Sequence, residues 1–488
     1  MSGIKQKLIE IAGKGNVVDD TQTLEAYARD QSFVLPVKPH CVVRPKNAEE
    51  AAAIVNWANK TQTPLVPVSS GAPHFRGDTV PSAPGAVVVD MSGMKKIIRI
   101  DRRSRTAIIE PGVTYPQLQQ ALAGEGMRVS MPLAPRANKS VVAALLEREP
   151  TLIPRYQWLA YEPLRNLEVI WGNGEKFRTG EPGNWKSMED AFEKKQSPAG
   201  TGGPGQLDYW RLVSAAQGSM GIVTWATVKC ELLPEIYKLF FVTSKKLDDL
   251  LSFVYKLLRF RFGDELLIMN NFNLAAVLGG KPDAVRARAM ELPAWSVLVT
   301  IAGRERLPRE RVEFQEKDIS DIAQQFGLKL VPEIAGARNG EVMKAVFNPS
   351  GEPYWKLGYQ GGCQDIFFLT TLDKTPGFVK AMYSVAEACQ YPVSEIGVYL
   401  QPVHQGASCH CEFHLPYNPK NNTETTRMHD FFGRASEEML KQGAYFSRPY
   451  GIWANMAYNR DAQTTYVLRK LKGIFDPNNV MNPGKLCF

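Results

Sequence analysis

The segment 398–415 is predicted to form two strands that carry several titratable side chains. Within 409–414 (CHCEFH), His410, Glu412 and His414 are two residues apart. Side chains at i, i+2 and i+4 of a β-strand point to one face of the sheet. A histidine changes protonation near neutral pH and can accept or deliver a proton. We therefore predict an acid–base centre here, with His410, or His404 in the preceding strand, as the base.

A second candidate group lies at 447–451 (SRPYG). The guanidinium of Arg448 can bind a carboxylate through two hydrogen bonds or stabilise a phenolate. The hydroxyls of Tyr450 and Tyr458 could orient a substrate oxygen. A structural ion pair is the alternative role for Arg448, and a core position is the alternative for Tyr450.

A strand followed by small residues predicts an anion site. The strand 64–68 (PLVPV) leads into Ser69-Ser70-Gly71-Ala72-Pro73-His74. Small side chains leave backbone N–H groups open to a pyrophosphate, which larger ones would block. An ordinary tight turn is the alternative. The sequence contains no GxGxxG after the first strand and no GxxxxGK[ST], so neither a doubly wound dinucleotide fold nor a P-loop fold is predicted.

The elements that must position these residues fall into two groups. Before residue 235, short strands alternate with turns and helices, which is typical of an α+β architecture. After it, strands at 238–243, 296–302 and 365–370 alternate with amphipathic helices at 247–260 and 308–326. This order predicts an antiparallel sheet backed by helices. The glycine- and proline-rich stretch 180–206 is predicted to be a long surface loop.

Composition excludes several classes of protein. The net charge of +8 is scattered along the 488 residues, so no nucleic-acid partner is predicted. Seven cysteines without a CxxC pair argue against a disulfide framework and against an iron–sulfur cluster held by this chain alone. We expect a reducing, cytoplasmic location, with no secretory signal and no membrane span, because long apolar segments are absent.

Three segments occur in a fixed order: 64–81 (PLVPVSSGAPHFRGDTVP) with the strands after it, 209–235, and 475–488 (FDPNNVMNPGKLCF). Together they resemble the vanillyl-alcohol oxidase and p-cresol methylhydroxylase (PCMH) superfamily of FAD-linked oxidases, near its glycolate-oxidase and D-lactate-dehydrogenase-like branch. The resemblance implies FAD as cofactor and a two-subdomain PCMH-type FAD-binding domain in 1–235. It also implies a substrate or cap domain in 236–440 and a segment, 441–488, that returns to the FAD domain.

The resemblance also implies which residues contact the cofactor. They are Ser69, Ser70, Gly71, Ala72, Pro73, His74, Pro132, Ser140, Val141, Gly218, Gly221, Ile222 and Asn482. Some members of the superfamily attach flavin covalently through a histidine in the first loop. His74 is therefore either an attachment site or a loop histidine that bonds to backbone or substrate. The segment 131–144 departs from the family's glycine-rich pattern, and Arg136 and Lys139 could pair with the pyrophosphate there.

No metal is predicted at His404 and His410. The glycolate and D-lactate branch has a two-histidine metal site completed by a Glu-His-Gly motif. Here the two histidines are one residue too close together, and 447–451 replaces that motif.

The activity implied is the dehydrogenation of an organic alcohol, either a 2-hydroxy acid or an aromatic alcohol. Flavin N5 accepts the hydride, while His404 or His410 takes the hydroxyl proton and Arg448 and Tyr450 hold the substrate. An electron-accepting protein subunit is expected as partner, in a homo- or hetero-oligomer. The alternatives are a flavin-bearing electron-transfer subunit without its own substrate chemistry, and a flavin-free scaffold.

Overall fold

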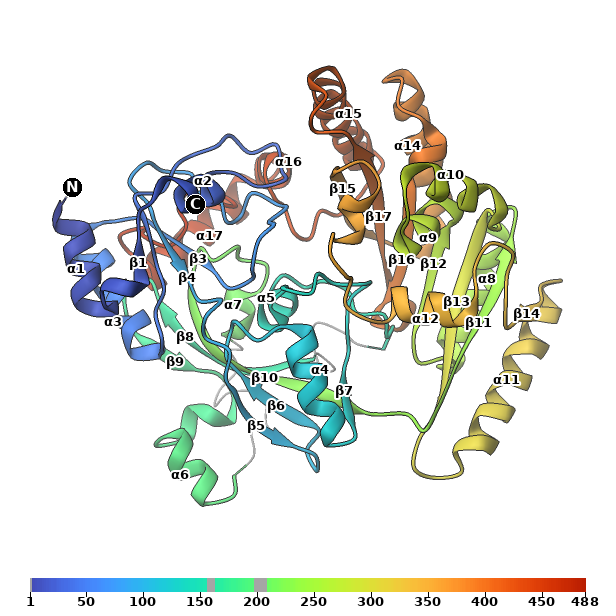
Figure 1. Cartoon of the computed structure of the whole chain (residues 1–488), viewed down its shortest axis with the longest axis horizontal. Coiled ribbons are helices and arrows are strands. Elements are labelled where there is room, and N and C mark those ends of the chain that lie inside the picture. The colour runs from blue at the N-terminus through green and yellow to red at the C-terminus, as the bar shows by residue number, and fades with distance from the viewer. Residues whose placement is uncertain (1, 156–162, 197–208) are drawn as a thin grey trace.

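The chain is described by a computed structural model that covers residues 2–155, 163–196 and 209–488 (Figure 1). Its first sheet has the order β1-β2-β4-β3. The strands are β1 Val17–Val18, β2 Cys41–Val43, β3 Leu65–Val68 and β4 Val87–Asp90. β2 and β3 run parallel to β4, while β1 is antiparallel to β2. β3 ends where the predicted anion loop begins.

Helices α1 Ser2–Ala12 and α3 Ala48–Thr61 pack against this first sheet. The side chain of Asn47 accepts a hydrogen bond from the Glu50 N–H and caps α3. The short helix α2, Thr21–Ala28, lies on the sheet's other side, where Leu24 packs beside Val42 and Val66.

The second sheet is antiparallel, with the order β5-β6-β10-β8-β9 and β7 paired to β10. Its strands are β5 Ile97–Asp101, β6 Thr106–Ile109, β7 Met127–Val129, β8 Leu164–Trp171, β9 Lys176–Arg178 and β10 Gly221–Leu232. Its helices are α4 Tyr115–Gly124, α5 Val141–Leu146, α6 Met188–Glu193 and α7 Trp210–Val213. The prediction of a loop over 180–206 was wrong for 188–193, where Ser187 caps α6; residues 197–208 lie outside the described part.

The third sheet is the largest and is also antiparallel, with the order β14-β11-β13-β12-β16-β17-β15. Its strands are β11 Ile236–Ser244, β12 Leu266–Asn270, β13 Trp295–Gly303, β14 Leu330–Val331, β15 Gly362–Thr370, β16 Gly397–Val403 and β17 Ser408–Tyr417. The helices of this part are α8 Asp248–Phe260, α9 Asn271–Leu278, α10 Pro282–Glu291, α11 Pro308–Gln325, α12 Asn339–Val346, α13 Trp355–Gly358, α14 Thr375–Ala388 and α15 Asn422–Lys441.

Helices cover both faces of the third sheet, so its strands are buried on both sides. In β11, Phe240 and Val242 pack with α8, α11, α14 and α15, whereas Leu239 and Phe241 pack with α9 and α12. Leu133 and Leu152, from the loops around α5, join the second of these clusters. That face therefore meets the first 235 residues, and the region between them is where a site can form.

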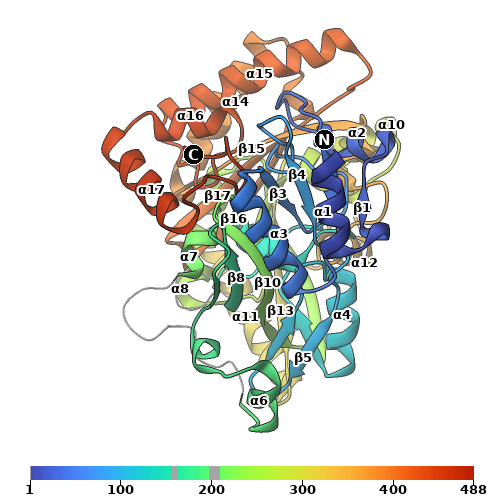
Figure 2. The same cartoon turned by 90° about the vertical axis from the view of Figure 1, so that its left-hand side faces the viewer.

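The chain returns to the first sheet after the third one. Tyr450 and Trp453 still pack in the core beneath the third sheet, which places the crossing after α16, Ile452–Tyr458. Helix α17, Ala462–Phe475, then lies beside the N-terminal elements (Figure 2). Met481 forms a parallel bridge with Leu65 at the start of β3. Among the described residues, no helix has both the length and the apolar character needed to cross a membrane.

Candidate active site

A large cavity lies between the third sheet and the loops of the first two sheets. It encloses about 1590 Å³, part of it open to solvent. Its walls come from the ends of β3 and β10, from the segment 132–150, and from β15, β16 and β17. The cavity therefore brings the predicted cofactor loops and the third sheet to one place.

The predicted anion loop is tied to the segment after β7 by hydrogen bonds. Arg136 Nη1 donates to the carbonyl of Gly71 over 2.9 Å and also to that of Pro73. The amide of Asn138 donates to the carbonyl of Ala72, and Gly71 N–H donates to the Asn138 carbonyl over 3.0 Å. The two loops that the sequence assigned to the cofactor therefore form one braced wall.

Part of the predicted cofactor set lines this cavity. Those residues are Ser69, Ser70, His74, Pro132, Gly218, Gly221 and Ile222. The other predicted residues, as the described part of the chain shows them, are not part of the cavity wall: Gly71, Ala72, Pro73, Ser140, Val141 and Asn482. Ser140, for example, accepts from Ala143 N–H to cap α5 and donates to the Pro111 carbonyl. Their roles as direct cofactor contacts remain predictions.

Two glycines keep the opposite wall open. A Cβ on Gly221 would press into the backbone carbonyl of Ile170 on β8. Gly218 has a φ of +70°, a conformation that favours glycine, and a Cβ there would lie 3.1 Å from Pro67. A larger residue at position 221 would press against β8, and one at position 218 would press against Pro67 in β3.

His74 lines the cavity as a neutral imidazole. Burial lowers its pKa to about 3, and the neighbouring Arg136 and Lys139 act in the same direction. A neutral imidazole has a free lone pair, which both of the roles predicted for His74 require. The structure leaves the choice between attachment site and loop residue open.

Residues near the end of the described chain hold the first loop from behind. The Asn482 amide donates to the carbonyls of Asp78 and Gln217 over 2.8 and 2.7 Å. The ammonium of Lys485 donates to the carbonyls of Gly77 and Val80, both over 2.8 Å. Asn482 therefore links the anion loop to the Gly218 loop, which lines the other wall of the cavity.

A buried group of charges lies beside the anion loop. Arg76 contacts Glu147 over 2.7 Å and Glu149 over 3.0 Å, and Lys139 contacts Glu147 over 2.7 Å. Burial works against the charged form of Glu149, but Lys139 and Arg76 outweigh it and hold its pKa at about 2. Burial instead raises the pKa of Glu147 and of Asp78. All five side chains line the cavity.

A second buried charge group is formed by the third sheet. Lys356, in α13, donates to Asp365 over 2.6 Å and to Glu412 over 2.5 Å. Glu412 also contacts His410 Nε2 over 2.9 Å. Burial disfavours the ammonium, but the two carboxylates outweigh it and hold the pKa of Lys356 well above its usual value.

Glu412 and His410 form a carboxylate–imidazole pair in which Glu412 favours its charged form and His410 its neutral form. Burial raises the pKa of Glu412, yet Lys356 and the bond from His410 lower it further, to well below its usual value. Burial lowers the pKa of His410, opposed by Glu412. The pair therefore consists of an ionised carboxylate at the cavity wall and a neutral imidazole beside it.

Arg448 brings an incompletely paired cation to the same cavity. Its side chain is 3 % exposed, and its Nη1 has no hydrogen-bond partner among the described residues. The guanidinium lies over the ring of Phe367, 4.2 Å from the centroid. Burial lowers the pKa of Arg448, and the nearby Arg76 adds to this. An arginine nevertheless stays protonated in a protein, so an anionic ligand would complete its hydrogen bonding.

The predicted catalytic residues lie at different depths from the cavity. Arg448 lines it, and His410 lies directly behind Glu412. Tyr450 is buried against Arg76, and the Arg76 guanidinium lies 5.3 Å from the centroid of the Tyr450 ring. His404 is half-buried in the turn after β16, 3.4 Å from the Ser408 hydroxyl, and is not part of the cavity wall.

Sequence reasoning missed Lys356 and Asp365. Lys356 is a single lysine in an irregular segment, and its carboxylate partners lie 9 and 56 residues away. Asp365 pairs directly with His414 in the β15–β17 register. The alternation of Cys363, Asp365 and Phe367 along β15 was the one available signal for a polar face there.

Comparison with known proteins gives matches along nearly the whole chain. A family model described as "FAD binding domain" matches residues 39–180, and one described as "FAD linked oxidases, C-terminal domain" matches residues 370–486. D-2-hydroxyglutarate dehydrogenase of Stutzerimonas stutzeri is 25% identical, over 97% of this chain and 96% of its own. The 4-cresol dehydrogenase (hydroxylating) flavoprotein subunit of Pseudomonas putida is 23% identical, over 98% and 94%.

Among solved structures, p-cresol methylhydroxylase with bound substrate superposes with a TM-score of 0.83 at 19% identity, covering 100% of this chain and 96% of that chain. This likeness confirms the predicted fold, which combines a two-part α+β domain with a second part built on an antiparallel sheet. FAD as the cofactor is likewise confirmed by the family models.

Proposed function

We propose that this chain, which belongs to the FAD-linked oxidases of the PCMH type, binds the anionic oxygen of its substrate through Arg448. It is an FAD-dependent oxidoreductase of the hydroxy-acid or aromatic-alcohol dehydrogenase type. The observation that carries the proposal is the Nη1 of Arg448, which lines the cavity without a hydrogen-bond partner among the described residues. A carboxylate or a phenolate supplies the acceptor that this buried donor lacks.

The surrounding charges restrict which anion can bind. Of the other cations at the cavity, Arg76, Lys139 and Lys356 pair with carboxylates of this chain. Arg136 instead donates to the carbonyls of Gly71 and Pro73. Among these cavity cations, Arg448 is the one with a buried donor that lacks a hydrogen-bond partner among the described residues. The aromatic rings of Tyr354, Trp355 and Tyr399 line the same region and favour a small substrate with an apolar body.

The bound flavin supplies the acceptor for the hydride at its N5. The protein must take the hydroxyl proton, and His410 is the proposed base. Its imidazole is neutral, and its Nε2 lies 2.9 Å from Glu412, which stands between His410 and the cavity and passes the proton on to it. Lys356 keeps Glu412 ionised and fixed in place.

Electrons leave the reduced enzyme for a protein acceptor in this proposal. The support is the relative from Pseudomonas putida, which is by name the flavoprotein subunit of a larger enzyme. The measurement is the rate of flavin reoxidation by air compared with that by added redox proteins. Rapid reoxidation by air alone would contradict a dedicated protein acceptor.

Anaerobic reduction of the purified, FAD-loaded protein tests the main proposal. The blue flavin absorption is followed while glycolate, both enantiomers of lactate and 2-hydroxyglutarate, and 4-alkylphenols or benzylic alcohols are added in turn. Bleaching by one class identifies the substrate. Bleaching by none of them, in a protein whose flavin is reduced by dithionite, would contradict the proposal and favour an electron-transfer subunit.

Acid precipitation of the same sample tests how the flavin is held. Colour in the supernatant means dissociable FAD and makes His74 a loop residue. Colour in the pellet means a covalent link, and a His74→Ala variant should then release the flavin on precipitation.

A further inference from the structure

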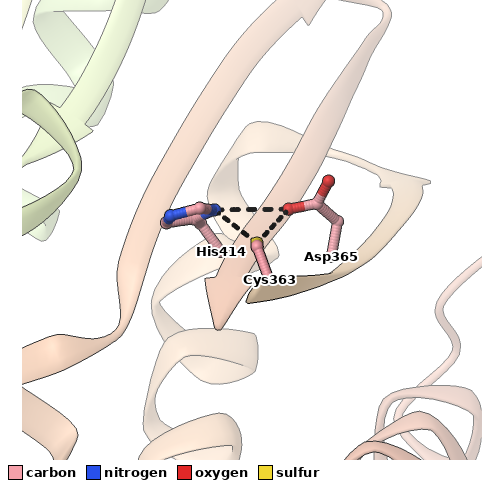
Figure 3. A group of neighbouring side chains, drawn as sticks. All are labelled: Cys363, Asp365 and His414. Carbon is pink, nitrogen blue, oxygen red and sulfur yellow. Dashed lines mark hydrogen bonds and ion pairs between the residues drawn. The ribbon is translucent and has the colours of Figure 1, made fainter. Parts of the chain in front are cut away.

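Three side chains with metal-binding atoms meet between β15 and β17. Cys363 Sγ lies 2.8 Å from His414 Nδ1 and 3.4 Å from Asp365 Oδ1, and the latter two atoms are also 3.4 Å apart. Figure 3 shows the three side chains directed toward one another. The antiparallel register explains this, since Asp365 pairs with His414 and Cys363 is two residues along on the same face.

The spacing of these atoms can be compared with that of a tetrahedral zinc site. With zinc–ligand bonds of about 2.3 Å to sulfur and about 2.0–2.1 Å to nitrogen and oxygen, neighbouring ligand atoms lie roughly 3.3–3.6 Å apart. The two distances to Asp365 Oδ1 already have this length. The Cys363–His414 distance must increase by about 0.7 Å, which small side-chain rotations supply. Two of the three separations therefore already match a zinc site, and the third differs by a change that side chains can make.

The second carboxylate oxygen of Asp365 is also held as in known metal sites. Lys356 donates to Asp365 Oδ2 over 2.6 Å, which leaves Oδ1 directed at Cys363 and His414. Ligating carboxylates in metal sites are oriented by such a hydrogen bond to the remaining oxygen.

The local charge favours a cation. Lys356 neutralises one of its two carboxylates, Asp365 and Glu412, so this buried group carries one excess negative charge. A divalent ion bound together with a Cys363 thiolate brings the total to zero. A buried uncompensated charge is costly, so this neutralisation stabilises the bound state.

We propose that Cys363, Asp365 and His414 bind a zinc ion. The ion displaces the thiol proton of Cys363 to solvent and forms bonds to Sγ, Oδ1 and Nδ1, with water in the fourth tetrahedral position. This site is separate from His404 and His410, neither of which belongs to the group. It joins β15 to β17 and fixes Asp365, and through Lys356 it positions Glu412 at the cavity wall.

Elemental analysis of the FAD-loaded protein, purified without an affinity tag or chelating resin, tests the proposal. Zinc is measured relative to flavin before and after incubation with excess zinc and gel filtration. One zinc per flavin is expected. The zinc-edge X-ray absorption spectrum should show one sulfur ligand at about 2.3 Å and the rest at about 2.0–2.1 Å. This readout does not depend on activity or on the identity of the substrate.

Cys363→Ser and His414→Gln should each lose zinc while retaining flavin. Cys389→Ser is the matched control, because Cys389 is also buried but lies at the end of α14 outside the group, and it should keep zinc. If Cys363→Ser fails to fold, the sulfur signal of the unmodified protein still decides. Three results would each overturn the proposal: little or no zinc after incubation, a spectrum without sulfur, or zinc retained in both variants.

Discussion

Replacing Arg448 with methionine should separate substrate binding from stability. The guanidinium is buried, and in the free enzyme its Nη1 lacks a hydrogen-bond partner among the described residues. Removing one member of a buried, hydrogen-bonded charge pair costs about 2–5 kcal/mol of binding. At 1.4 kcal/mol per tenfold, kcat/KM for the anionic substrate should fall by about 30-fold to about 4,000-fold.

The same substitution should leave the folded state intact. The unmodified protein already bears the cost of an unsatisfied buried donor, which is about 1–3 kcal/mol. Methionine fills a similar volume without that donor, so the free energy of unfolding should stay equal or increase. Steady-state kinetics and thermal unfolding of the FAD-loaded proteins measure the two effects. A marked loss of Tm with less than a tenfold loss of kcat/KM would refute the reasoning and make Arg448 a structural cation.

Arg76→Met is the matched control, since the Arg76 guanidinium also lies over the Phe367 ring, 4.9 Å from its centroid, but is paired with Glu147 and Glu149. Its removal leaves buried carboxylates short of a partner, which costs about 3–5 kcal/mol of stability. The two arginines should therefore respond in opposite ways in thermal unfolding.

Three further predictions concern the cavity walls. Lys356→Met leaves two buried carboxylates unpaired and should lower the free energy of unfolding by about 3–5 kcal/mol, measured by urea denaturation at pH 7. Because the pKa of His74 is about 3 when folded and 6.5 when unfolded, stability should fall as the pH drops from 6.5 toward 3. The free energy of unfolding should fall by about 1.4 kcal/mol per pH unit in this range. In His74→Gln this contribution should be absent, which urea unfolding midpoints of both proteins at pH 6.5 and 4.5 measure. An equal pH dependence of the midpoint in the two proteins would contradict the prediction. Gly221→Ala should cost about 1–3 kcal/mol and reduce the flavin-to-protein ratio after gel filtration, whereas Gly433→Ala, in an open part of α15, should keep full flavin.

The fold could be predicted wherever local patterns agree with tertiary packing. The helix near 247–260 and the strands near 238–243 and 296–302 were found because their periodicity matches the faces they bury. Helix α6 was missed because the surrounding glycines and prolines dominate the local signal. The order of strands in the third sheet depends on contacts far apart in sequence, which no local pattern records.

The site could be predicted only in part for a related reason. The alternation in 409–414 correctly placed His410, Glu412 and His414 on one face, because a strand fixes side-chain direction. It could not show that Lys356, from a different element, bridges Asp365 of β15 and Glu412 of β17. The pairing of loop 69–74 with 136–140 also depends on tertiary contacts, so the sequence could not separate residues that line the cavity from those that brace it.

The distance along the chain between the anion loop and its braces has a consequence for biosynthesis. Asn482 and Lys485 hold carbonyls of residues 77–80 that precede them by more than 400 positions. At roughly 5–20 residues per second, a ribosome takes about 20–80 s to cover that interval. The anion loop is therefore translated well before the residues that hold the segment after it, so flavin should bind only after residues 482–485 have been translated. A nonsense mutation shortly before Asn482 should therefore yield a colourless protein despite an intact anion loop.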